Sequence, residues 1–170
     1  MISEKLFKEL NTQIGFEFYS ANLYLAMAAY CSSQDMDGFA NFFRVQAEEE
    51  RFHAMKIYDY INDMGGRVNI GAIDEPINEY SSMLDCFEKA YAHEKSVTKR
   101  FYDLLSLATD EKEFATMSFL QWFIDEQREE ENTFNKLMKK LQRNKDNSAG
   151  VYMIDTELAT RTFVVPANNR

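Results

Sequence analysis

The most constraining feature of this sequence is a polar interruption in the middle of a long apolar helical stripe. A helix predicted over about Asp37 to Met64 carries inward-facing residues at alternating steps of four and three, which is typical of a helix packed in a bundle. These positions are Phe39, Phe43, Gln46, Glu50, His53, Ile57, Tyr60 and Met64. The ends of the stripe are apolar, but its middle holds a carboxylate and an imidazole three residues apart. Such a pair lies on one face, with Cβ atoms about 5–6 Å apart. Isolated Glu-x-x-His pairs are also common on solvated surfaces. Whether Glu50 and His53 form a ligand pair therefore depends on whether the other helices also place polar residues at this height.

Three more long helices are predicted, over about residues 3–32, 82–108 and 113–143. Short breaks join the first helix to the second and the third to the fourth, so each of these pairs should be antiparallel. The N-terminal caps expected from the sequence are Ser3, Ser82 with Asp85, and Asp110 with Glu113. A short fifth helix is expected at about 148–158, followed by a tail over 159–170. We expect all of residues 1–170 to form one domain.

The connection between the second and third helices is much longer. Gly65 and Gly66 end the second helix, and no sustained period follows from Arg67 to Tyr80. An extended segment of this length reaches roughly 50 Å, whereas the 28-residue helix before it is about 42 Å long. The linker can therefore run the full length of the bundle, which makes the second and third helices parallel. The predicted fold is an all-α four-helix bundle with a long crossover and a short fifth helix.

Composition supports this class and excludes several functions. Only 6 glycines and 2 prolines occur in 170 residues, as in an all-helical chain. The net charge of -9 argues against nucleic-acid binding. No apolar run of about 20 residues is present, so no membrane span is expected, and the chain opens directly on an amphipathic helix, which favours the cytoplasm. Cys31 and Cys86 lack metal-type spacing and are interpreted as reduced thiols.

All four long helices interrupt their apolar stripe at a similar height. The polar residues there are Glu17 in the first helix, Glu50 and His53 in the second, Glu94 in the third, and Gln127 and Glu130 in the fourth. Burying ionised carboxylates costs several kcal/mol each unless cations pair with them, and a domain is stable by only about 5–15 kcal/mol. None of the stripes supplies a Lys or Arg at this height. Two divalent metal ions resolve the conflict, because carboxylates with one or two imidazoles suit iron or manganese.

The sequence resembles the non-haem bacterial ferritins over essentially its whole length. The matching motifs are Glu17-Phe18-Tyr19 with Tyr24, Glu49-Glu50-Arg51-Phe52-His53, Gln127-Arg128-Glu129-Glu130, and Val151 to Asp155 with Glu157-Leu158. The resemblance implies a ferritin-like bundle, ferroxidase activity towards Fe(II) with dioxygen or hydrogen peroxide as oxidant, and deposition of Fe(III) mineral inside a homo-oligomeric cage of 24 subunits.

The resemblance also implies roles for individual residues. Glu17 and His53 would bind the first iron, Glu50 would bridge, and Glu94 and Glu130 would bind the second. Gln127 would lie near the second iron as a hydrogen-bonding group, and Tyr24 would support the site from outside its ligands. A third, outer iron site would use Glu49, Glu126 and Glu129 and share Glu130. The runs Glu48-Glu49-Glu50 and Glu129-Glu130-Glu131 are also what a solvated acidic face looks like.

Several alternatives compete with this interpretation. A haem-carrying bacterioferritin places Met after the bridging Glu, where this chain has Arg51, and a His where Glu130 stands, so no haem is expected. A DNA-protecting mini-ferritin builds its site between subunits, and the acidic balance and the intact four-helix ligand set of this chain argue against that class. A soluble di-iron oxidase or peroxidase generally has a second Glu-x-x-His, but this chain has only 2 histidines, and His93 is interpreted as a surface residue. A catalytically silent shell subunit is disfavoured by the complete ligand set. Trp122, one step off the stripe, is expected to have a packing role.

Overall fold

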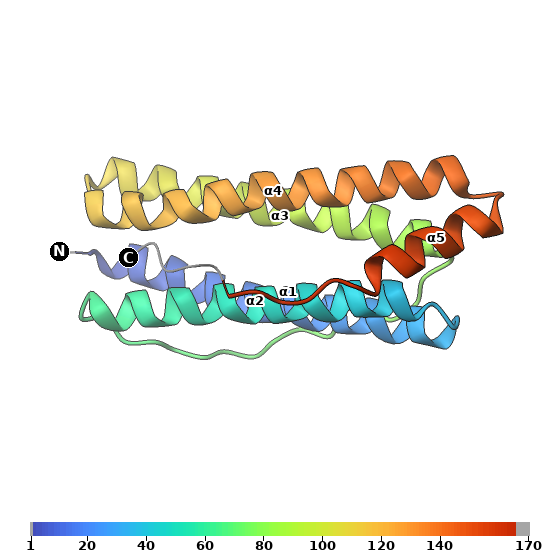
Figure 1. Ribbon diagram of the computed structural model, residues 1–170. Helices are drawn as coiled ribbons and strands as arrows, with labels where there is room; N and C mark the ends of the chain where they lie inside the picture. The colour runs from blue at the N-terminus through green and yellow to red at the C-terminus, as the bar shows by residue number, and fades with distance from the viewer. Residues whose placement is uncertain (1, 166–170) are drawn as a thin grey trace.

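The computed structural model describes residues 2–165, and this stretch contains five α-helices (Figure 1). They are α1 (Glu4–Ser33), α2 (Asp37–Asp63), α3 (Met83–Asp110), α4 (Phe114–Asn144) and α5 (Ser148–Leu158). The four long helices and the short fifth helix lie where the sequence predicts them, within one or two residues. Of the tail predicted over 159–170, residues 166–170 lie outside the described residues.

Two of the three predicted helix caps are confirmed. The Ser3 hydroxyl accepts a hydrogen bond from the Leu6 amide at 3.0 Å, and the Ser82 hydroxyl accepts one from the Asp85 amide at 3.0 Å. The cap predicted at Asp110 is wrong, because Asp110 is the last residue of α3. Lys112, with φ of 57°, turns the chain in the left-handed region immediately afterwards. The connection is therefore tighter than predicted, and α3 uses the residue assigned to the next cap.

The helices form two antiparallel pairs, α1 with α2 and α3 with α4, joined by a long crossover over residues 64–82 (Figure 1). The crossover runs along the α1–α2 pair from one end of the bundle to the other, so α2 and α3 are parallel, as predicted. Gly65 has φ of +77°, and the Gly66 amide donates to the Ile61 carbonyl at 2.8 Å, which ends α2. A Cβ on Gly66 would lie 2.4 Å from the Phe7 ring, so glycine is needed where the crossover leaves the bundle.

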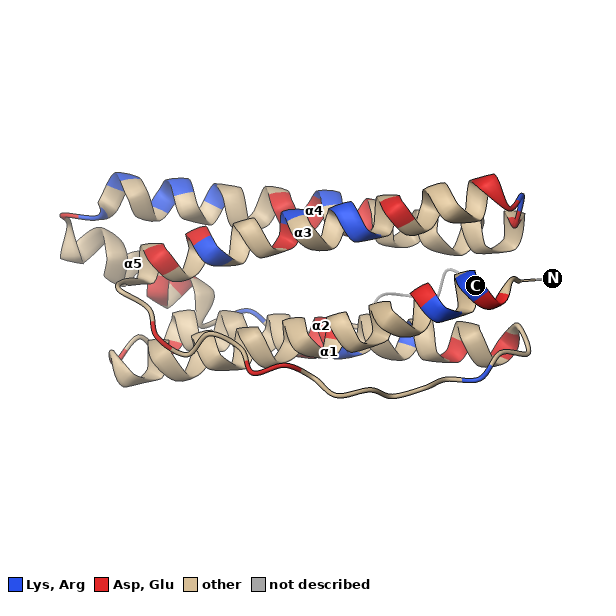
Figure 2. Cartoon of the chain, turned by 180° about the vertical axis from the view of Figure 1, so that it is seen from behind, with Lys and Arg blue, Asp and Glu red and all other residues tan. Residues whose placement is uncertain are grey.

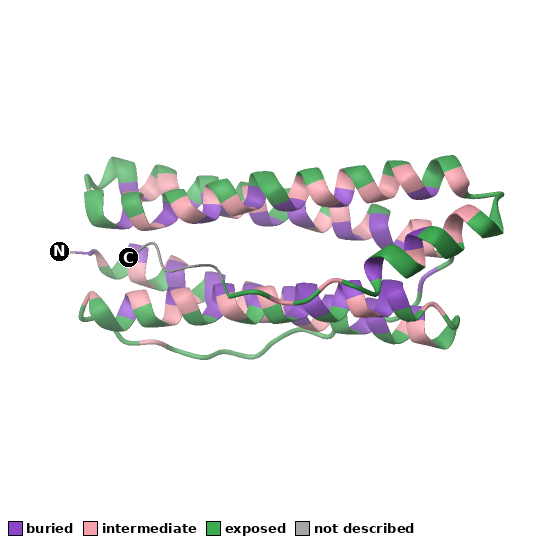
Figure 3. Cartoon of the chain, in the orientation of Figure 1, coloured by how far each residue is buried: buried purple, intermediate pink, exposed green. Residues whose placement is uncertain are grey.

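The interior consists of two apolar clusters with a polar layer between them. Buried residues recur along all four long helices (Figure 3). One cluster, near α5, includes Tyr24, Met27, Phe39, Phe43, Phe87, Phe134 and Ile154. The other, at the opposite end, includes Leu6, Leu10, Ile57, Ile61, Phe101 and Phe123. The buried polar residues of the middle layer are Gln13, Glu17, Ser20, Gln46, Glu50, His53, Glu94, Gln127 and Glu130. The predicted interruption of all four stripes is thus a continuous buried layer.

Helix α5 packs across the end of the bundle against α2 and α4. Its Asp155 carboxylate accepts a hydrogen bond from the Phe39 amide at 2.9 Å, in the first turn of α2. Gly38 permits this close approach, because a Cβ there would lie 1.7 Å from the Asp155 carbonyl oxygen. Charged residues are spread along α3 and α4, with basic residues gathered toward the C-terminal end of α4 (Figure 2). Within residues 2–165, no helix has an apolar stretch long enough to cross a bilayer.

Candidate metal centre

The polar layer brings together one carboxylate from each long helix. Glu17, Glu50, Glu94 and Glu130 come from α1 to α4 in order, and their relative exposures are 0%, 1%, 0% and 7%. His53, one turn after Glu50 on α2, is 2% exposed. A helical period of 3.6 residues places each of these on the inner stripe that the apolar residues define. The structure therefore places all five predicted di-iron ligands in the same buried layer.

Three of these side chains are close enough to hold one ion. Ligand atoms of Glu17, Glu50 and His53 all lie within 4.8 Å of one another. The His53 Nδ1 atom is 3.4 Å from Glu50 Oε2 and 4.0 Å from Glu17 Oε2. Two carboxylate oxygens and an imidazole nitrogen form the mixed hard and intermediate donor set that suits iron or manganese.

The donor atoms of this trio lack protein partners. Glu17 Oε2, both Glu50 carboxylate oxygens and His53 Nδ1 are buried without a hydrogen bond. Buried polar atoms are almost always hydrogen-bonded, so four such atoms in one place require an explanation. Within the part of the chain that the structure describes, no Lys or Arg forms an ion pair with Glu17 or Glu50. Orphaned acceptors facing one another at this spacing fit a bound cation.

The other two acids are oriented by neutral donors. Gln127 Nε2 donates to Glu94 Oε2 at 2.9 Å, and the Tyr24 hydroxyl donates to Glu94 Oε1. Gln46 Nε2 donates to Glu130 Oε2 at 2.9 Å. Each hydrogen bond uses one lone pair of a carboxylate oxygen. The other lone pair of that oxygen stays available to a metal ion.

Glu17 has a comparable support on α1. Gln13 Nε2 donates to Glu17 Oε1 at 2.6 Å, and Arg100 Nε of α3 donates to Gln13 Oε1 at 2.8 Å. The Arg100 charge is thus one residue removed from the buried acid. Gln13 and Gln46 each lie on the predicted stripe, four residues before a ligand. This spacing could have indicated that they support the site, although no role was assigned to them from sequence.

Burial raises the pKa of the acids in this layer. The pKa of Glu94 is raised to about 7 and that of Glu130 to about 8, in both cases mainly by burial. Burial, followed by neighbouring carboxyls, also raises the pKa of Glu17 and of Glu50 well above the usual range. Without a cation these groups hold protons near neutral pH, and a cation would displace those protons.

The three predicted outer ligands lie in different surroundings. Glu126 is half-buried and Glu129 is exposed. Glu49 is half-buried, and its Oε2 atom lies 2.7 Å from Arg161 Nη2. These three side chains do not form a compact ligand group like that of Glu17, Glu50 and His53, so the third iron site stays a prediction. Arg161 was not predicted from the sequence, where it lies in a segment without periodicity.

Two aromatic residues, Trp122 and His93, pack near the centre. Trp122 packs its indole edge-on against His53, with ring centroids 5.5 Å apart, which agrees with the predicted packing role. His93 is not the surface residue predicted from sequence. It is half-buried, its ring stacks on Phe16 at 5.4 Å, and its Nε2 atom lies 2.7 Å from the Ser20 hydroxyl. Burial lowers the pKa of His93 to about 4, so its imidazole is neutral.

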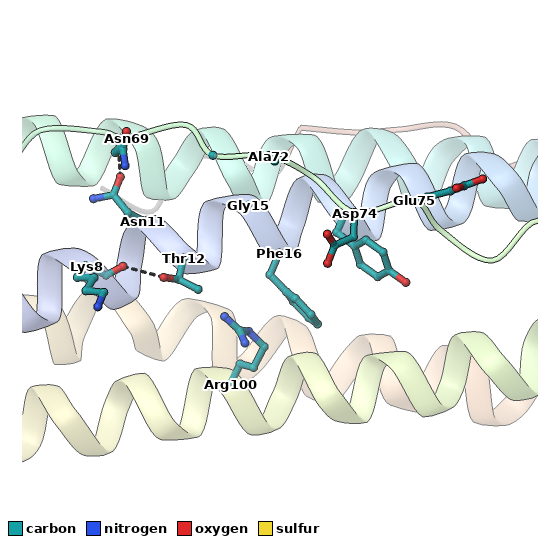
Figure 4. Close-up of a pocket in the computed structure, with 12 residues that line it drawn as sticks. Lys8, Asn11, Thr12, Gly15, Phe16, Asn69, Ala72, Asp74, Glu75 and Arg100 are labelled. Atoms are coloured by element: carbon teal, nitrogen blue, oxygen red, sulfur yellow. Dashed lines mark hydrogen bonds between the residues drawn. The ribbon is translucent and has the colours of Figure 1, made fainter.

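A cleft of about 690 Å³ lies elsewhere, between α1, the crossover and Arg100 (Figure 4). Arg100 points toward α1 in this view, and its guanidinium lies 4.3 Å from the Phe16 ring centroid. None of the five buried ligand candidates lines this cleft. Its link to the centre is indirect, through the hydrogen bond from Arg100 to Gln13.

Known proteins are similar to this chain in both sequence and fold. A ferritin-like domain matches residues 7–144. The bacterial non-heme ferritin of Staphylococcus epidermidis is 48% identical over 163 residues, covering 96% of this chain and 98% of that protein. The corresponding protein of Staphylococcus aureus strain MRSA252 is 47% identical over the same shares.

Solved structures that resemble this chain are also ferritins. An engineered closed form of the Archaeoglobus fulgidus ferritin has a TM-score of 0.95 at 46% identity, covering 96% of this chain and 100% of that one. A humanized archaeal ferritin has a TM-score of 0.96 at 44% identity, covering 97% and 100%. Sequence and fold therefore agree over nearly the whole chain, which belongs to the ferritin family.

Proposed function

We propose that the protein stores iron by oxidising Fe(II) at a centre within each subunit and depositing the Fe(III) product inside a hollow cage of identical subunits. The observation that carries this proposal is the set of orphaned donor atoms on Glu17, Glu50 and His53. A buried layer with unsatisfied carboxylates is unfavourable in a metal-free protein, so its retention is best explained by a cation-dependent activity.

Each buried ligand has a distinct role in this proposal. Glu17 and His53 bind one Fe(II), and Glu94 and Glu130 bind the second. Glu50 lies between the two groups with both oxygens free of hydrogen bonds, which suits a carboxylate that bridges two ions. Gln127 and Tyr24 hold the Glu94 carboxylate, and Gln46 holds that of Glu130.

The reaction balances as a two-electron oxidation of a pair of ions. Each Fe(II) gives up one electron, and dioxygen or hydrogen peroxide accepts the two electrons together with protons. The carboxylate-rich set favours Fe(III) over Fe(II), because hard oxygen anions bind the harder ion more strongly. Iron is the substrate here, so the oxidised ions must leave the centre for the mineral.

The resemblance to the ferritins also implies an assembly and a location. We propose a homo-oligomeric cage of 24 subunits, the assembly expected from the resemblance, since a mineral store needs an enclosed volume. With a charge of -9 per subunit, acidic groups on the inner surface would concentrate cations. A cytoplasmic location stays a prediction. Negative-stain imaging of the purified protein should show hollow spheres, and free monomers would contradict the storage part of the proposal.

The oxidation step is tested by an anaerobic Fe(II) titration followed by a pulse of oxygen. Wild-type protein should take up two Fe(II) per subunit and oxidise them rapidly, as followed by the ultraviolet absorbance of Fe(III). Glu50→Ala should lower the initial rate by at least about tenfold, because it removes the bridging carboxylate. Glu48→Ala is the matched control, since Glu48 is an exposed acid two residues away on the same helix. Equal rates for Glu50→Ala and wild type would refute the assignment.

A further inference from the structure

The acids Glu49, Glu126 and Glu129 differ in what neutralises them. Glu126 is half-buried and Glu129 is exposed, and both line an open depression on α4. Glu49 is only 23% exposed and already has a cation of the protein's own, because Arg161 Nη2 lies 2.7 Å from its Oε2 atom. Arg161 is itself 26% exposed, so the ion pair is largely shielded from solvent.

Arg161 comes from the C-terminal strap, defined here as residues 159–165, which lies alongside α2 (Figure 1). Asn41 of α2 fastens the start of the strap, since its Nδ2 atom donates to the carbonyls of Leu158 at 3.0 Å and Arg161 at 2.9 Å. Farther along, the Phe163 ring packs on Phe52 with centroids 6.3 Å apart. Contacts on both sides of Glu49 thus hold the strap over this part of α2.

The Arg161 side chain is positioned as well as its backbone. Its guanidinium carbon lies 4.5 Å from the centroid of the Phe42 ring, a cation–π contact that fixes the plane of the group. Its Nη1 atom is buried without a hydrogen-bond partner. Arg161 also lines a cleft of about 530 Å³ together with Glu129, so open space adjoins the ion pair on the side of the outer acids.

A guanidinium and a metal ion compete for the same carboxylate lone pairs. We propose that Arg161 stands in for a metal ion at Glu49, so that the centre binds two ions tightly and a third only when Arg161 leaves. This inference rests on the proposed ferroxidase centre and deepens it, since it makes Arg161 the residue that sets how many ions each subunit holds. The strap thereby links occupancy of the outer site to the docking of the C-terminal segment on α2.

The test is metal stoichiometry measured on the assembled full-length protein with Zn²⁺, which does not undergo oxidation. Isothermal titration of wild type should show two tight sites per subunit and a weaker third. Arg161→Gln should strengthen the third site by about tenfold, because a half-buried ion pair is worth on the order of one such step. Arg161→Lys, which keeps a charge, should resemble wild type. Lys99→Gln is the control, since Lys99 is an exposed cation on α3 that pairs with Asp103, away from the outer acids.

Further variants keep the proposal falsifiable if Arg161→Gln does not assemble. Asn41→Ala retains Arg161 but removes the hydrogen bonds from Asn41 to the carbonyls of Leu158, Ala159 and Arg161, so it should strengthen the third site to an intermediate extent. Adding Glu49→Gln to either variant should abolish the gain. Three equally tight sites in wild type, or no gain in Asn41→Ala and Arg161→Gln, would overturn the role of Arg161. Absence of the two tight sites themselves would instead overturn the proposed metal centre.

Discussion

The protein places glutamates that are neighbours in sequence into opposite physical situations. Glu50 and Glu130 lie in the buried layer, whereas Glu49 and Glu129, one residue before each of them, lie toward the surface. A rotation of about 100° per residue around the helix separates the two kinds of position. The inner acids are shielded from solvent, and among the described residues no Lys or Arg forms an ion pair with them, so their ionised forms depend on a bound cation. The outer acids are solvated or, at Glu49, already paired with Arg161.

The largest expected effect is the stabilisation of the inner layer by metal. Zn²⁺ at about 1,000 times its dissociation constant should stabilise the folded protein by about 4 kcal/mol per site, seen as a rise in Tm by scanning calorimetry. Glu17→Ala should lose about half of this rise, because it removes a ligand of the compact trio but leaves Glu94 and Glu130 to hold the second ion.

The control for that experiment is an acid of the outer group. Glu126→Ala should keep nearly all of the metal-induced rise in Tm, since Glu126 is half-exposed and lies outside the trio. If Glu17→Ala and Glu126→Ala lost equal amounts, the distinction between inner and outer acids would have no energetic basis.

The inner layer was predictable because each of the four long helices carries polar residues in the middle of its apolar stripe. An apolar stripe with four-three spacing fixes which way each helix faces, and a single error in register would have turned an acid outward. Glu17, Glu50, Glu94 and Glu130 all fall on their stripes, and all are buried. The crossover was predictable because the helical period stops after Gly65 and Gly66 and the segment that follows is long enough to span the bundle.

The strap and His93 could not be predicted from the same signal. Arg161 meets Glu49 across 112 residues of sequence, and no periodic pattern in the tail specifies where it docks. His93 lies one position before Glu94, which turns it away from the bundle axis but toward α1, where Phe16 and Ser20 cover it. A stripe defines the centre of a helix interface but not its width, so residues at the edge of the stripe were assigned to solvent.

The next effect is a pH dependence of opposite sign in the metal-free and metal-bound protein. Glu94 and Glu130 have pKa values raised to about 7 and about 8, above the ordinary value of 4.5. The folded state therefore binds more protons than the unfolded state between about pH 4.5 and 8, and the stability contributed by these acids is lost as pH rises through that window. The Tm of the metal-free protein should fall by the equivalent of a few kcal/mol between about pH 5 and 9.

With Zn²⁺ bound, the sign reverses, because metal binding requires the ionised carboxylates and releases their protons. Glu130→Gln should flatten the metal-free profile, whereas Glu129→Gln, its exposed neighbour, should leave the profile unchanged. Calorimetry at a series of pH values compares four curves, which are those of metal-free wild type, zinc-bound wild type, metal-free Glu130→Gln and metal-free Glu129→Gln. A metal-free Tm that increased from pH 6 to pH 8.5 would contradict the assigned protonation of the inner acids.

The smallest expected effect concerns a group that touches the inner layer without belonging to it. The Tyr24 hydroxyl donates to Glu94 Oε1 from within the apolar cluster near α5, so it joins the two environments. Tyr24→Phe removes this donor and keeps the ring, which stacks on Phe134 with centroids 5.7 Å apart. We expect Fe(II) oxidation to slow by about threefold to tenfold, since one hydrogen bond to a ligand carboxylate is worth about 1 kcal/mol.

The second readout for Tyr24→Phe separates orientation of the ligand from simple loss of packing. If the hydroxyl positions Glu94, Zn²⁺ affinity should fall by a similar factor while the Tm of the metal-free protein changes little, because the ring and its contacts remain. Tyr19→Phe serves as the control, since Tyr19 is half-buried and its ring packs on His93 rather than on a ligand. Equal losses in the two variants would mean that the hydroxyl of Tyr24 contributes nothing specific, and that Gln127 alone is sufficient to hold Glu94.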